Sequence, residues 1–503
     1  MLHRIILATA AVAFFSVQAA ERPNVLFLIS DDLNNSLGCY GHPLVKTPNI
    51  DRLAARGVRF DRAYCQFPLC GPSRNSVLTG LYPNSTGILT NSQVFRQTIP
   101  KHVSLPQAFR QEGYFAARIG KLYHYGVPAS IGTNGHDDPG SWELELNPAG
   151  SDRLEEESNI FTLTPGQFGG TLSWYASPKT DQYHTDGMQA ENAEWLLKRC
   201  ADKPDRPFFL GLGFFRPHTP YVSPKSYFDL YPVADMPLVQ GVAEDQKDLP
   251  KQALGSYKKE QDKLTDDLRR QAVQAYFASI SFMDAQVGRV LDSLKSLGLE
   301  EKTIVVMTSD HGYHLGEHGL WQKQSLFEES ARVPLIIAAP GVSKAGGVAA
   351  APVGLVDLYP TLAELAGVKT PANLQGQSLV PLLKDPAAAG RGWALSEVVR
   401  GGGFNRMGAA PAVGDDGKRI FGYSLRTVRW RYTEWGEGKE GRELYDHDAD
   451  PRELTNLADS PAQAETVAAL SLQLRDAVKG TFPANGKIPE LGTAVWAPNL
   501  TNP

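Results

Sequence analysis

The sequence predicts an α/β protein: a large, mostly parallel or mixed sheet covered by helices on both faces, and a smaller C-terminal α+β subdomain with an antiparallel sheet. Continuous apolar runs of this kind are typical of strands buried on both faces. They lie at residues 24–30, 207–214, 303–309 and 333–339. Long helical periodicities separate them, the longest from about residue 265 to 297. Strands that alternate with helices indicate a parallel sheet.

Composition limits the class of protein. The chain has 503 residues, of which 42% are hydrophobic and 21% charged, so it can bury a large core and is not a disordered chain. A net charge of −5 argues against a protein that coats nucleic acid. Four cysteines are too few for a disulfide framework. These values are typical of a globular enzyme.

The N-terminus has the pattern of a signal peptide spanning residues 1–20. Arg4 precedes thirteen apolar residues, 5–17, and small residues follow, which predicts cleavage near Ala19-Ala20. A run of this length is too short to cross a bilayer, which needs about 20 apolar residues. The alternative is a buried strand or helix at the terminus. We therefore expect a periplasmic or secreted protein without a stable membrane anchor.

The chain divides into two predicted units after the signal peptide. Residues 21–388 form the catalytic domain, and residues 389–503 form the C-terminal subdomain, with a Pro/Ala/Gly-rich junction near residue 385. The subdomain is expected to hold strand-like stretches and one helix, at 393–399, 423–433, 443–446 and 461–478. Polar, Gly/Pro-rich or charged segments at 131–180 and 235–265 are expected to be insertions in the catalytic domain.

Polar side chains follow the predicted strands at their carboxyl ends, where doubly wound sheets bind ligands. They are Asp31 and Asp32, Asp310 and His311, Lys121 and His124, and Arg216 and His218. Adjacent carboxylates at one edge repel each other unless a cation compensates them, and oxygen ligands favour Ca²⁺ or Mg²⁺. For Asp31-Asp32 alone, a helix N-cap or a solvated turn is an equal alternative. The joint occurrence of these groups favours a metal site.

The segment Cys70-Gly-Pro-Ser-Arg74 is the most specific local pattern. Pro72 and Ser73 suit the first turn of a helix that continues to Gly80. Cys70 is then expected just before this helix, where the N-terminal N–H groups favour an anion. Arg74 projects from the same face and can hold an oxyanion. The alternative, a cysteine buried as a small apolar residue, is preferred for Cys39, Cys65 and Cys200.

The pattern Cys70-x-Pro72-Ser73-Arg74 with Thr79-Gly80 resembles the signature of the type I sulfatases, in the alkaline phosphatase superfamily. The resemblance extends over nearly the whole chain in the expected order. Within the family it is strongest toward the iduronate-2-sulfatase-like branch. The motifs that carry it include Leu37–Gly41, Gly120–His124, Phe215–Tyr221, Asp310–Gly312, Gly316–Lys323 and Glu443–Asp446. The resemblance implies an alkaline phosphatase-like fold and a sulfuric ester hydrolase.

The resemblance also implies the catalytic groups. Cys70 is converted to Cα-formylglycine by a formylglycine-generating enzyme or an anaerobic maturase, and the hydrate is the nucleophile. One Ca²⁺ ion, or alternatively Mg²⁺, is held by residue 70 with Asp31, Asp32, Asp310 and His311. Arg74, Lys121 and Lys323 stabilise the sulfate oxygens. Asp310 and His124 accept protons, and His218, assisted by Lys323, protonates the leaving alcohol.

The substrate is expected to be a sulfated oligosaccharide or polysaccharide. A 2-O-sulfated uronic acid of glycosaminoglycan type is the first choice and an algal sulfated glycan the second. Tyr313, His318, Trp321 and Trp174 are candidate contacts to the sugar. A formylglycine-dependent phosphodiesterase or phosphonate monoester hydrolase is an alternative within the superfamily. A carbohydrate-binding protein on a decayed hydrolase scaffold is an alternative of another class.

Overall fold

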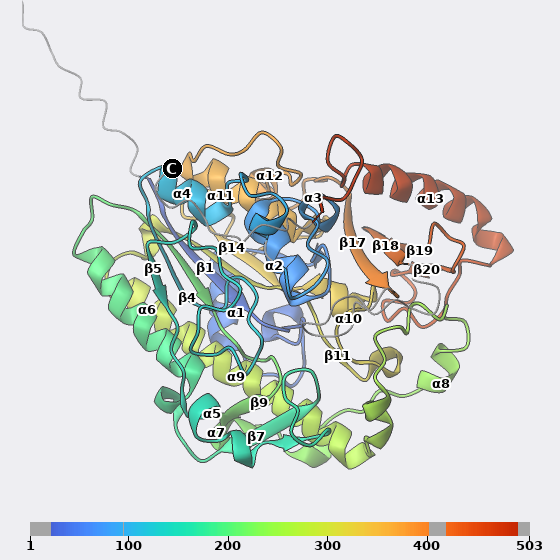
Figure 1. Cartoon of the computed structure of the whole chain (residues 1–503), viewed down its shortest axis with the longest axis horizontal. Helices are drawn as coiled ribbons and strands as arrows, with labels where there is room; N and C mark the ends of the chain where they lie inside the picture. Colours follow the sequence, from blue (N-terminus) through green and yellow to red (C-terminus); the bar gives the residue numbers. More distant parts are fainter. Residues whose placement is uncertain (1–21, 94, 402–418, 491–503) are drawn as a thin grey trace, which may run out of the picture.

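An eight-stranded mixed sheet forms the centre of the molecule (Figure 1). The computed structural model describes residues 22–93, 95–401 and 419–490. The strand order is β15-β2-β14-β10-β1-β8-β4-β5. The central strand β1 pairs in parallel with β10 and β8, whereas β14 runs antiparallel to β10. The bounds are β1 Asn24–Ser30, β2 Val58–Phe60, β4 Phe115–Gly120, β5 Leu144–Leu146, β8 Phe208–Gly213, β10 Thr303–Ser309, β14 Leu335–Ala338 and β15 Gly347–Ala349.

Helices cover both faces of this sheet, which confirms the predicted fold class. Along β1, Leu26 and Leu28 face one core while Val25, Phe27 and Ile29 face the other, as the two-residue period of a strand requires. The first core contains helices α1 Pro48–Arg56, α6 Thr185–Ala201 and α9 Asp266–Ser296. The second contains α2 Cys70–Thr79, α4 Leu105–Gln111, α11 Leu358–Ala366 and α12 Val380–Lys384. The apolar runs are therefore buried on both sides.

The C-terminal region forms a separate four-stranded antiparallel sheet in the order β17-β18-β19-β20 (Figure 1, right). Helix α13 packs on it through a shared apolar cluster. The bounds are β17 Trp393–Arg400, β18 Ile420–Thr427, β19 Trp430–Trp435, β20 Arg442–Asp446 and α13 Ala464–Lys479. The antiparallel sheet was predicted, whereas the boundary at residue 388 stays a prediction. The proposed signal peptide, 1–20, lies outside the described residues.

Three local predictions were wrong. Helix α2 begins at Cys70 rather than at Pro72, so Cys70 lies in its first turn. The expected strand 333–339 is divided at Pro334, which lacks the N–H that a continuous ladder needs, into β13 Arg332–Val333 and β14. The expected single stretch 423–433 is a hairpin, because the chain reverses between β18 and β19.

The two insertions and the loops carry short elements. Segment 131–180 contains β5 and the pair β6–β7, and β7 pairs in parallel with β9. Within the described residues, none of the helices combines the length and apolar character needed to cross a membrane. The remaining short elements are β3 Ala63–Tyr64, α3 Pro83–Thr86, α5 Ser151–Leu154, β6 Phe161–Thr162, β7 Ser173–Ser177, β9 Tyr221–Pro224, α7 Lys225–Phe228, α8 Val242–Asp245, β11 His314–Leu315, β12 Trp321–Gln322, α10 Glu328–Ala331 and β16 Val353–Gly354.

A buried ion-pair network joins the C-terminal sheet to helix α10 and strand β3. Arg431 of β19 pairs with Glu328 of α10 and with Glu453. Glu453 also accepts a hydrogen bond from His447 at 2.8 Å, and Tyr64 donates to Glu328 at 2.9 Å. Burial raises the pKa of Glu453, but Arg431 and His447 together outweigh burial and hold this pKa at about 2. Because these charges compensate one another in the interior, the loss of one partner leaves the others unpaired.

Replacing Arg431 with methionine should lower the free energy of unfolding by about 3–5 kcal/mol, because Glu328 and Glu453 then remain buried without their cation. Arg429→Met is the matched control, since the Arg429 side chain is 51% exposed where it pairs with Asp446. This exposed pair should contribute little, because solvent screens it. Urea unfolding followed by tryptophan fluorescence measures both variants. Equal losses would contradict the role of the buried network.

Candidate active site

Three carboxylates meet at the carboxyl edge of the sheet. Asp31 and Asp32 follow β1 and Asp310 follows β10, and the parallel register aligns Ser30 with Ser309. The backbone N–H of Asp32 donates to Asp310 Oδ1 at 3.1 Å. One oxygen from each carboxylate lies within 4.8 Å of the other two, and Asp32 Oδ2 is buried without a hydrogen bond. A buried oxygen set of this kind fits a hard divalent cation.

Arg74 ties two of these carboxylates together. From helix α2 its Nε donates to Asp310 Oδ2 at 2.8 Å and its Nη2 to Asp31 Oδ1 at 3.1 Å. Its other donors reach the backbone carbonyls of Ser30, Lys121 and Leu122. All five N–H groups of this fully buried guanidinium are thus engaged. Arg74 therefore positions the carboxylates rather than pointing a free donor into the site.

Two lysines add positive charge to the cluster. Lys121 Nζ donates to Asp31 Oδ2 at 2.6 Å, and Lys323 Nζ donates to Asp32 Oδ1 at 2.5 Å. Lys121 follows β4 directly after Gly120, which has a φ of +69°. A Cβ at Gly120 would lie 2.4 Å from the carbonyl oxygen of Gly213, so only glycine fits. The end of β4 thereby directs Lys121 into the site.

Cys70 lies among these charges. Its Sγ is 3.3 Å from Lys323 Nζ and 3.3 Å from His311 Nε2. Burial raises the pKa of the thiol, but attraction from Lys121 and Lys323 outweighs burial and holds the pKa well below its usual range. The Nδ1 of His311 lies 2.9 Å from the carbonyl of Gly312 and therefore carries the proton, which leaves Nε2 facing Cys70. Several cations thus surround the side chain of residue 70 and stabilise a negative charge on it.

Two further histidines border the cluster. His124 is hydrogen-bonded to Cys70, and burial lowers the pKa of its imidazole to about 4, so the ring is neutral at neutral pH. His218 places Nδ1 at 2.5 Å from the carbonyl of Thr219, and its Nε2 lies 3.8 Å from Asp32 Oδ2. The loop before His218 is fixed where Ser30 Oγ donates to the carbonyl of Arg216 at 2.6 Å.

A cavity of about 300 Å³ opens onto this cluster. His124, His218 and Lys323 line its inner wall. The outer wall comes from the two insertions and from the loop around Lys323. The residues that line it there are Gly169, Gly170, Gly255, Ser256, Tyr257, Lys258, Gln322 and Gln324. The structure therefore brings the predicted catalytic histidines and Lys323 to one opening, together with Asp31, Asp32, Cys70, Asp310 and His311 behind it.

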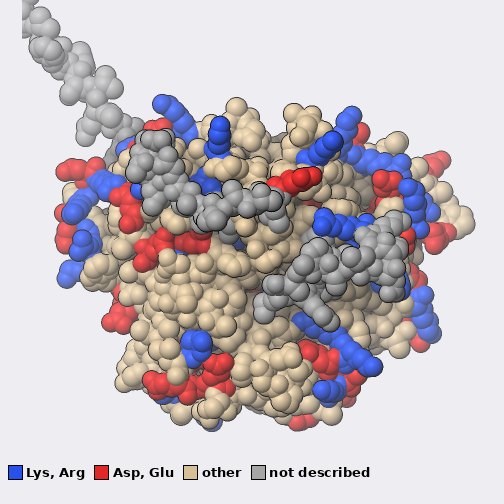
Figure 2. Space-filling model, viewed as in Figure 1, with Lys and Arg blue, Asp and Glu red and all other residues tan. Residues whose placement is uncertain are grey.

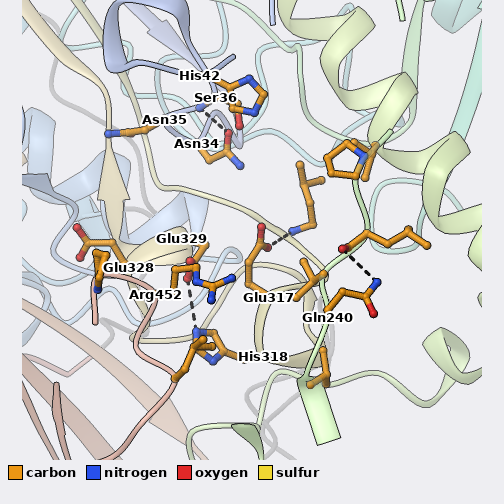
Figure 3. A pocket seen from close by; sticks show the side chains of 18 of the residues that line it. Asn34, Asn35, Ser36, His42, Gln240, Glu317, His318, Glu328, Glu329 and Arg452 are labelled. Atoms are coloured by element: carbon orange, nitrogen blue, oxygen red, sulfur yellow. Dashed lines mark hydrogen bonds and ion pairs between the residues drawn. The ribbon is translucent and has the colours of Figure 1, made fainter. Parts of the chain in front are cut away.

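The four predicted sugar contacts lie elsewhere among the described residues. Tyr313, Trp321 and Trp174 are buried in the first core. His318 lines a second cavity of about 510 Å³, where it faces Glu329 at 3.7 Å (Figure 3). Its Nδ1 lies 3.0 Å from Asp245 Oδ2. Contact of these four side chains with substrate stays a prediction.

Comparisons with known proteins agree with this geometry. The family model described as "Sulfatase" matches residues 23–368. A sulfatase of Formosa agariphila is 34% identical over 454 residues, covering 88% of this chain and 84% of the relative. The chain belongs to the sulfatase family. It is therefore a sulfuric ester hydrolase.

Two further proteins are similar to the chain. Iduronate 2-sulfatase of Mus musculus is 32% identical over 481 residues, covering 83% of this chain and 85% of the relative. The crystal structure of a phosphonate monoester hydrolase of Agrobacterium radiobacter superposes with a TM-score of 0.73 at 23% identity, covering 93% of this chain and 100% of that one. At this identity the second likeness concerns the fold alone. The chain is similar to both proteins.

Sequence reasoning missed residues that hold or border the site. Ser73 Oγ donates to the carbonyl of Asp310, and Ser309 Oγ donates to the carbonyl of His311 at 2.8 Å. Ser73 lies within the segment Cys70–Arg74, and Ser309 is the last residue of the predicted strand 303–309. Their positions in the sequence could therefore have indicated a role at the site. Lys258 and Tyr257 come from a charged insertion with no motif. Only the fold brings that insertion to the cavity.

Arg74→Met should lower the free energy of unfolding of this sulfatase by about 3–5 kcal/mol, because Asp31 and Asp310 lose their shared buried cation. It should also lower kcat for an aryl sulfate by about 100-fold or more, since displaced carboxylates misplace the reacting groups. Thermal unfolding and initial rates measure the two effects. The control Arg52→Met removes a surface pair with Asp292 and should change neither. Wild-type activity in Arg74→Met would refute the positioning role.

Proposed function

We propose that this sulfatase hydrolyses sulfate esters of a sulfated carbohydrate, with a 2-O-sulfated uronic acid of glycosaminoglycan-type oligosaccharides as its substrate. The observation that carries the proposal is the position of Cys70, whose Sγ lies 3.3 Å from both Lys323 Nζ and His311 Nε2, next to the cavity of about 300 Å³ that Lys323 lines. The similarity to mouse iduronate 2-sulfatase supports the choice of sugar. An algal sulfated glycan is the alternative substrate.

Residue 70 is proposed to act as Cα-formylglycine, whose hydrate would supply the nucleophilic oxygen. The surroundings of Cys70 suit such a group, because Lys121 and Lys323 stabilise negative charge on its side chain. A sulfate ester carries negative oxygens that repel a nucleophile, so the same lysines also bring the two together. Conversion requires a formylglycine-generating enzyme or an anaerobic maturase during export, as the proposed signal peptide at residues 1–20 implies.

Asp31, Asp32, Asp310 and His311 are proposed to hold one divalent cation together with residue 70. When bound, Ca²⁺ would polarise the oxygens around sulfur and offset the carboxylate charge. Three carboxylates favour Ca²⁺, with Mg²⁺ as the alternative, whereas the imidazole of His311 is a softer ligand. The Oδ2 of Asp32, which is buried without a hydrogen bond, supports this assignment.

Protons are proposed to move through three side chains. Asp310 accepts a proton from the side chain at residue 70, which lies beside it in the cluster. His218 donates to the leaving alcohol from Nε2, assisted by Lys323. The neutral ring of His124, in contact with residue 70, accepts the proton that is released when sulfate departs.

The formylglycine-dependent phosphodiesterases and phosphonate monoester hydrolases remain the alternative activity. Phosphate and sulfate esters are both tetrahedral and differ in charge, so the same cations can bind either. The likeness to the Agrobacterium radiobacter enzyme concerns the fold alone. Parallel rates on an aryl sulfate and an aryl phosphonate distinguish the two activities. A higher kcat/KM on the phosphonate would overturn the proposal.

The peptide that contains Cys70 should be lighter by about 18 Da than its sequence mass, because conversion replaces CH₂SH with CHO. Tryptic mass spectrometry of protein coexpressed with a maturase measures this deficit. Cys70→Ala should abolish both the deficit and sulfate release, whereas Cys200→Ala, at the half-buried C-terminal end of α6, should abolish neither. Full activity with an intact Cys70 thiol would refute the formylglycine mechanism.

Adding Ca²⁺ to chelator-treated enzyme should raise the free energy of unfolding, by about 2.7 kcal/mol at a hundredfold excess over the dissociation constant. Asp32→Asn should remove most of this gain because it deletes one charged ligand. Asp292→Asn, at a side chain that is 63% exposed, should keep it. Thermal unfolding with and without Ca²⁺ measures the effect. An equal gain in Asp32→Asn would place the cation elsewhere.

A further inference from the structure

One cation of the cavity has no role in the mechanism above. Lys258 lines this cavity together with His124 and His218, and it comes from the 235–265 insertion. The only hydrogen bond of its Nζ in the described residues goes to the backbone carbonyl of Gly170, and no ion pair forms there. The nearby carboxylate of Glu260 instead accepts from Thr164 Oγ1 at 2.8 Å. Lys258 therefore carries a charge without a counter-charge bound to it.

The structure holds Lys258 in a defined place relative to Lys323. The carbonyl of Gly170 accepts hydrogen bonds from both Lys258 Nζ and Gln322 Nε2, the latter at 2.9 Å. Gln322 and Gln324 flank Lys323 with φ angles of +110° and +69°. Backbone conformations that are this rare for non-glycine residues are retained where the surroundings impose them. Gly170 thus connects the outer lysine to the loop that carries the inner one.

The turn that carries Gly170 is itself anchored beside the catalytic histidines. A Cβ at Gly169 would lie 1.8 Å from the carbonyl oxygen of Val127, so the turn packs tightly against the loop after His124. On its other side, Thr219 Oγ1, next to His218, donates to the carbonyl of Gly169 at 2.7 Å. The outer wall is therefore fixed to both histidine loops rather than free to move away.

Electrostatics make this lysine a site for an anion. Burial lowers the pKa of Lys258 to about 8, and repulsion from Lys323 adds to this effect against the attraction of Glu260. A cation that is desolvated and close to another cation gains most from a bound anionic partner. The chain as a whole has a net charge of −5, so attraction of a polyanion must come from local groups such as this one. Figure 2 shows acidic and basic side chains interspersed around one face of the molecule.

We propose that Lys258 binds a second anionic group of the substrate, on the sugar whose sulfate ester is hydrolysed, and that this group is a carboxylate or another sulfate. The cavity of about 300 Å³ accommodates one sugar ring with its substituents. The scissile sulfate lies against Lys121 and Lys323, and the second anion lies at the outer wall against Lys258. This inference rests on the proposed function. It narrows the substrates to sugars that carry two negative charges on one ring.

The test compares Lys258→Met with wild type on four substrates. They are a 2-O-sulfated uronate disaccharide, its uronate methyl ester, a disulfated hexosamine and an aryl sulfate with no second anion. The ratio of kcat/KM for the dianionic sugar to that for the aryl sulfate should fall roughly 10- to 100-fold, as expected for a lost hydrogen bond between charged groups, and mainly through KM. Lys258→Arg should restore part of the ratio.

Lys259→Met provides the matched control, because the neighbouring side chain is exposed and does not line the cavity. It should leave the ratio unchanged. If the second anion is a carboxylate, wild type should lose the preference on the methyl ester. If it is a sulfate, the disulfated hexosamine should show the fall instead. An unchanged ratio in Lys258→Met would overturn the subsite.

Failure of the proposed function has a different signature. A wild-type enzyme that releases sulfate from the aryl ester but from neither dianionic sugar would refute the substrate class, and the subsite with it. A wild-type enzyme that prefers a dianionic sugar, together with an equal loss of kcat/KM on all four substrates in Lys258→Met, would leave the substrate class standing. In that case Lys258 would have a structural role only.

Discussion

The site depends on keeping three carboxylates buried at one edge of the central sheet. Asp31, Asp32 and Asp310 repel one another there, and the structure compensates this with Arg74 and two lysines. Arg74 matters most because its planar group reaches two carboxylates and three carbonyls at once, which a lysine cannot do. Its donors also fix the ends of β1 and β4 relative to helix α2. The buried charge thus orders the backbone around it.

The same charge compensation bears on Cys70, which lies in the first turn of α2. The helix places Cys70 and Arg74 one turn apart, so the guanidinium that holds the carboxylates also sets the distance from residue 70 to His311. Helix α2 begins at Cys70, which is earlier than the sequence predicts. The backbone N–H groups of its first turn therefore also lie near residue 70. The cysteine is buried, yet its surroundings favour an anion. That combination distinguishes it from Cys65, whose thiol pKa burial raises.

The sequence predicted the buried strands and the charged groups that follow them, because an apolar run and a polar strand end are local patterns. It did not predict how the insertions fold back, since polar segments such as 235–265 have no periodicity that specifies their partners. Lys258 was missed for this reason. Trp174 and Tyr313 were proposed as sugar contacts from their residue type, but their burial in the core depends on packing against α9 that no local pattern reveals. The strand break at Pro334 was readable, because proline has no N–H to donate.

The cations of the inner cluster and Lys258 of the outer wall differ in their partners, and this difference follows from the same need to compensate the carboxylates. The inner cations already have protein partners. The N–H groups of Arg74 all bond to protein oxygens, and Lys121 and Lys323 each contact a carboxylate. In the proposed mechanism they act on the sulfate group, which every sulfate ester presents, so they do not distinguish one sugar from another. Under the same proposal, discrimination comes from groups that are not needed for the reaction, such as Lys258 of the insertion 235–265. The carboxylates and cations of the inner cluster hold one another in place by charge balance. The residues of the outer wall can therefore differ without moving the groups that are proposed to react.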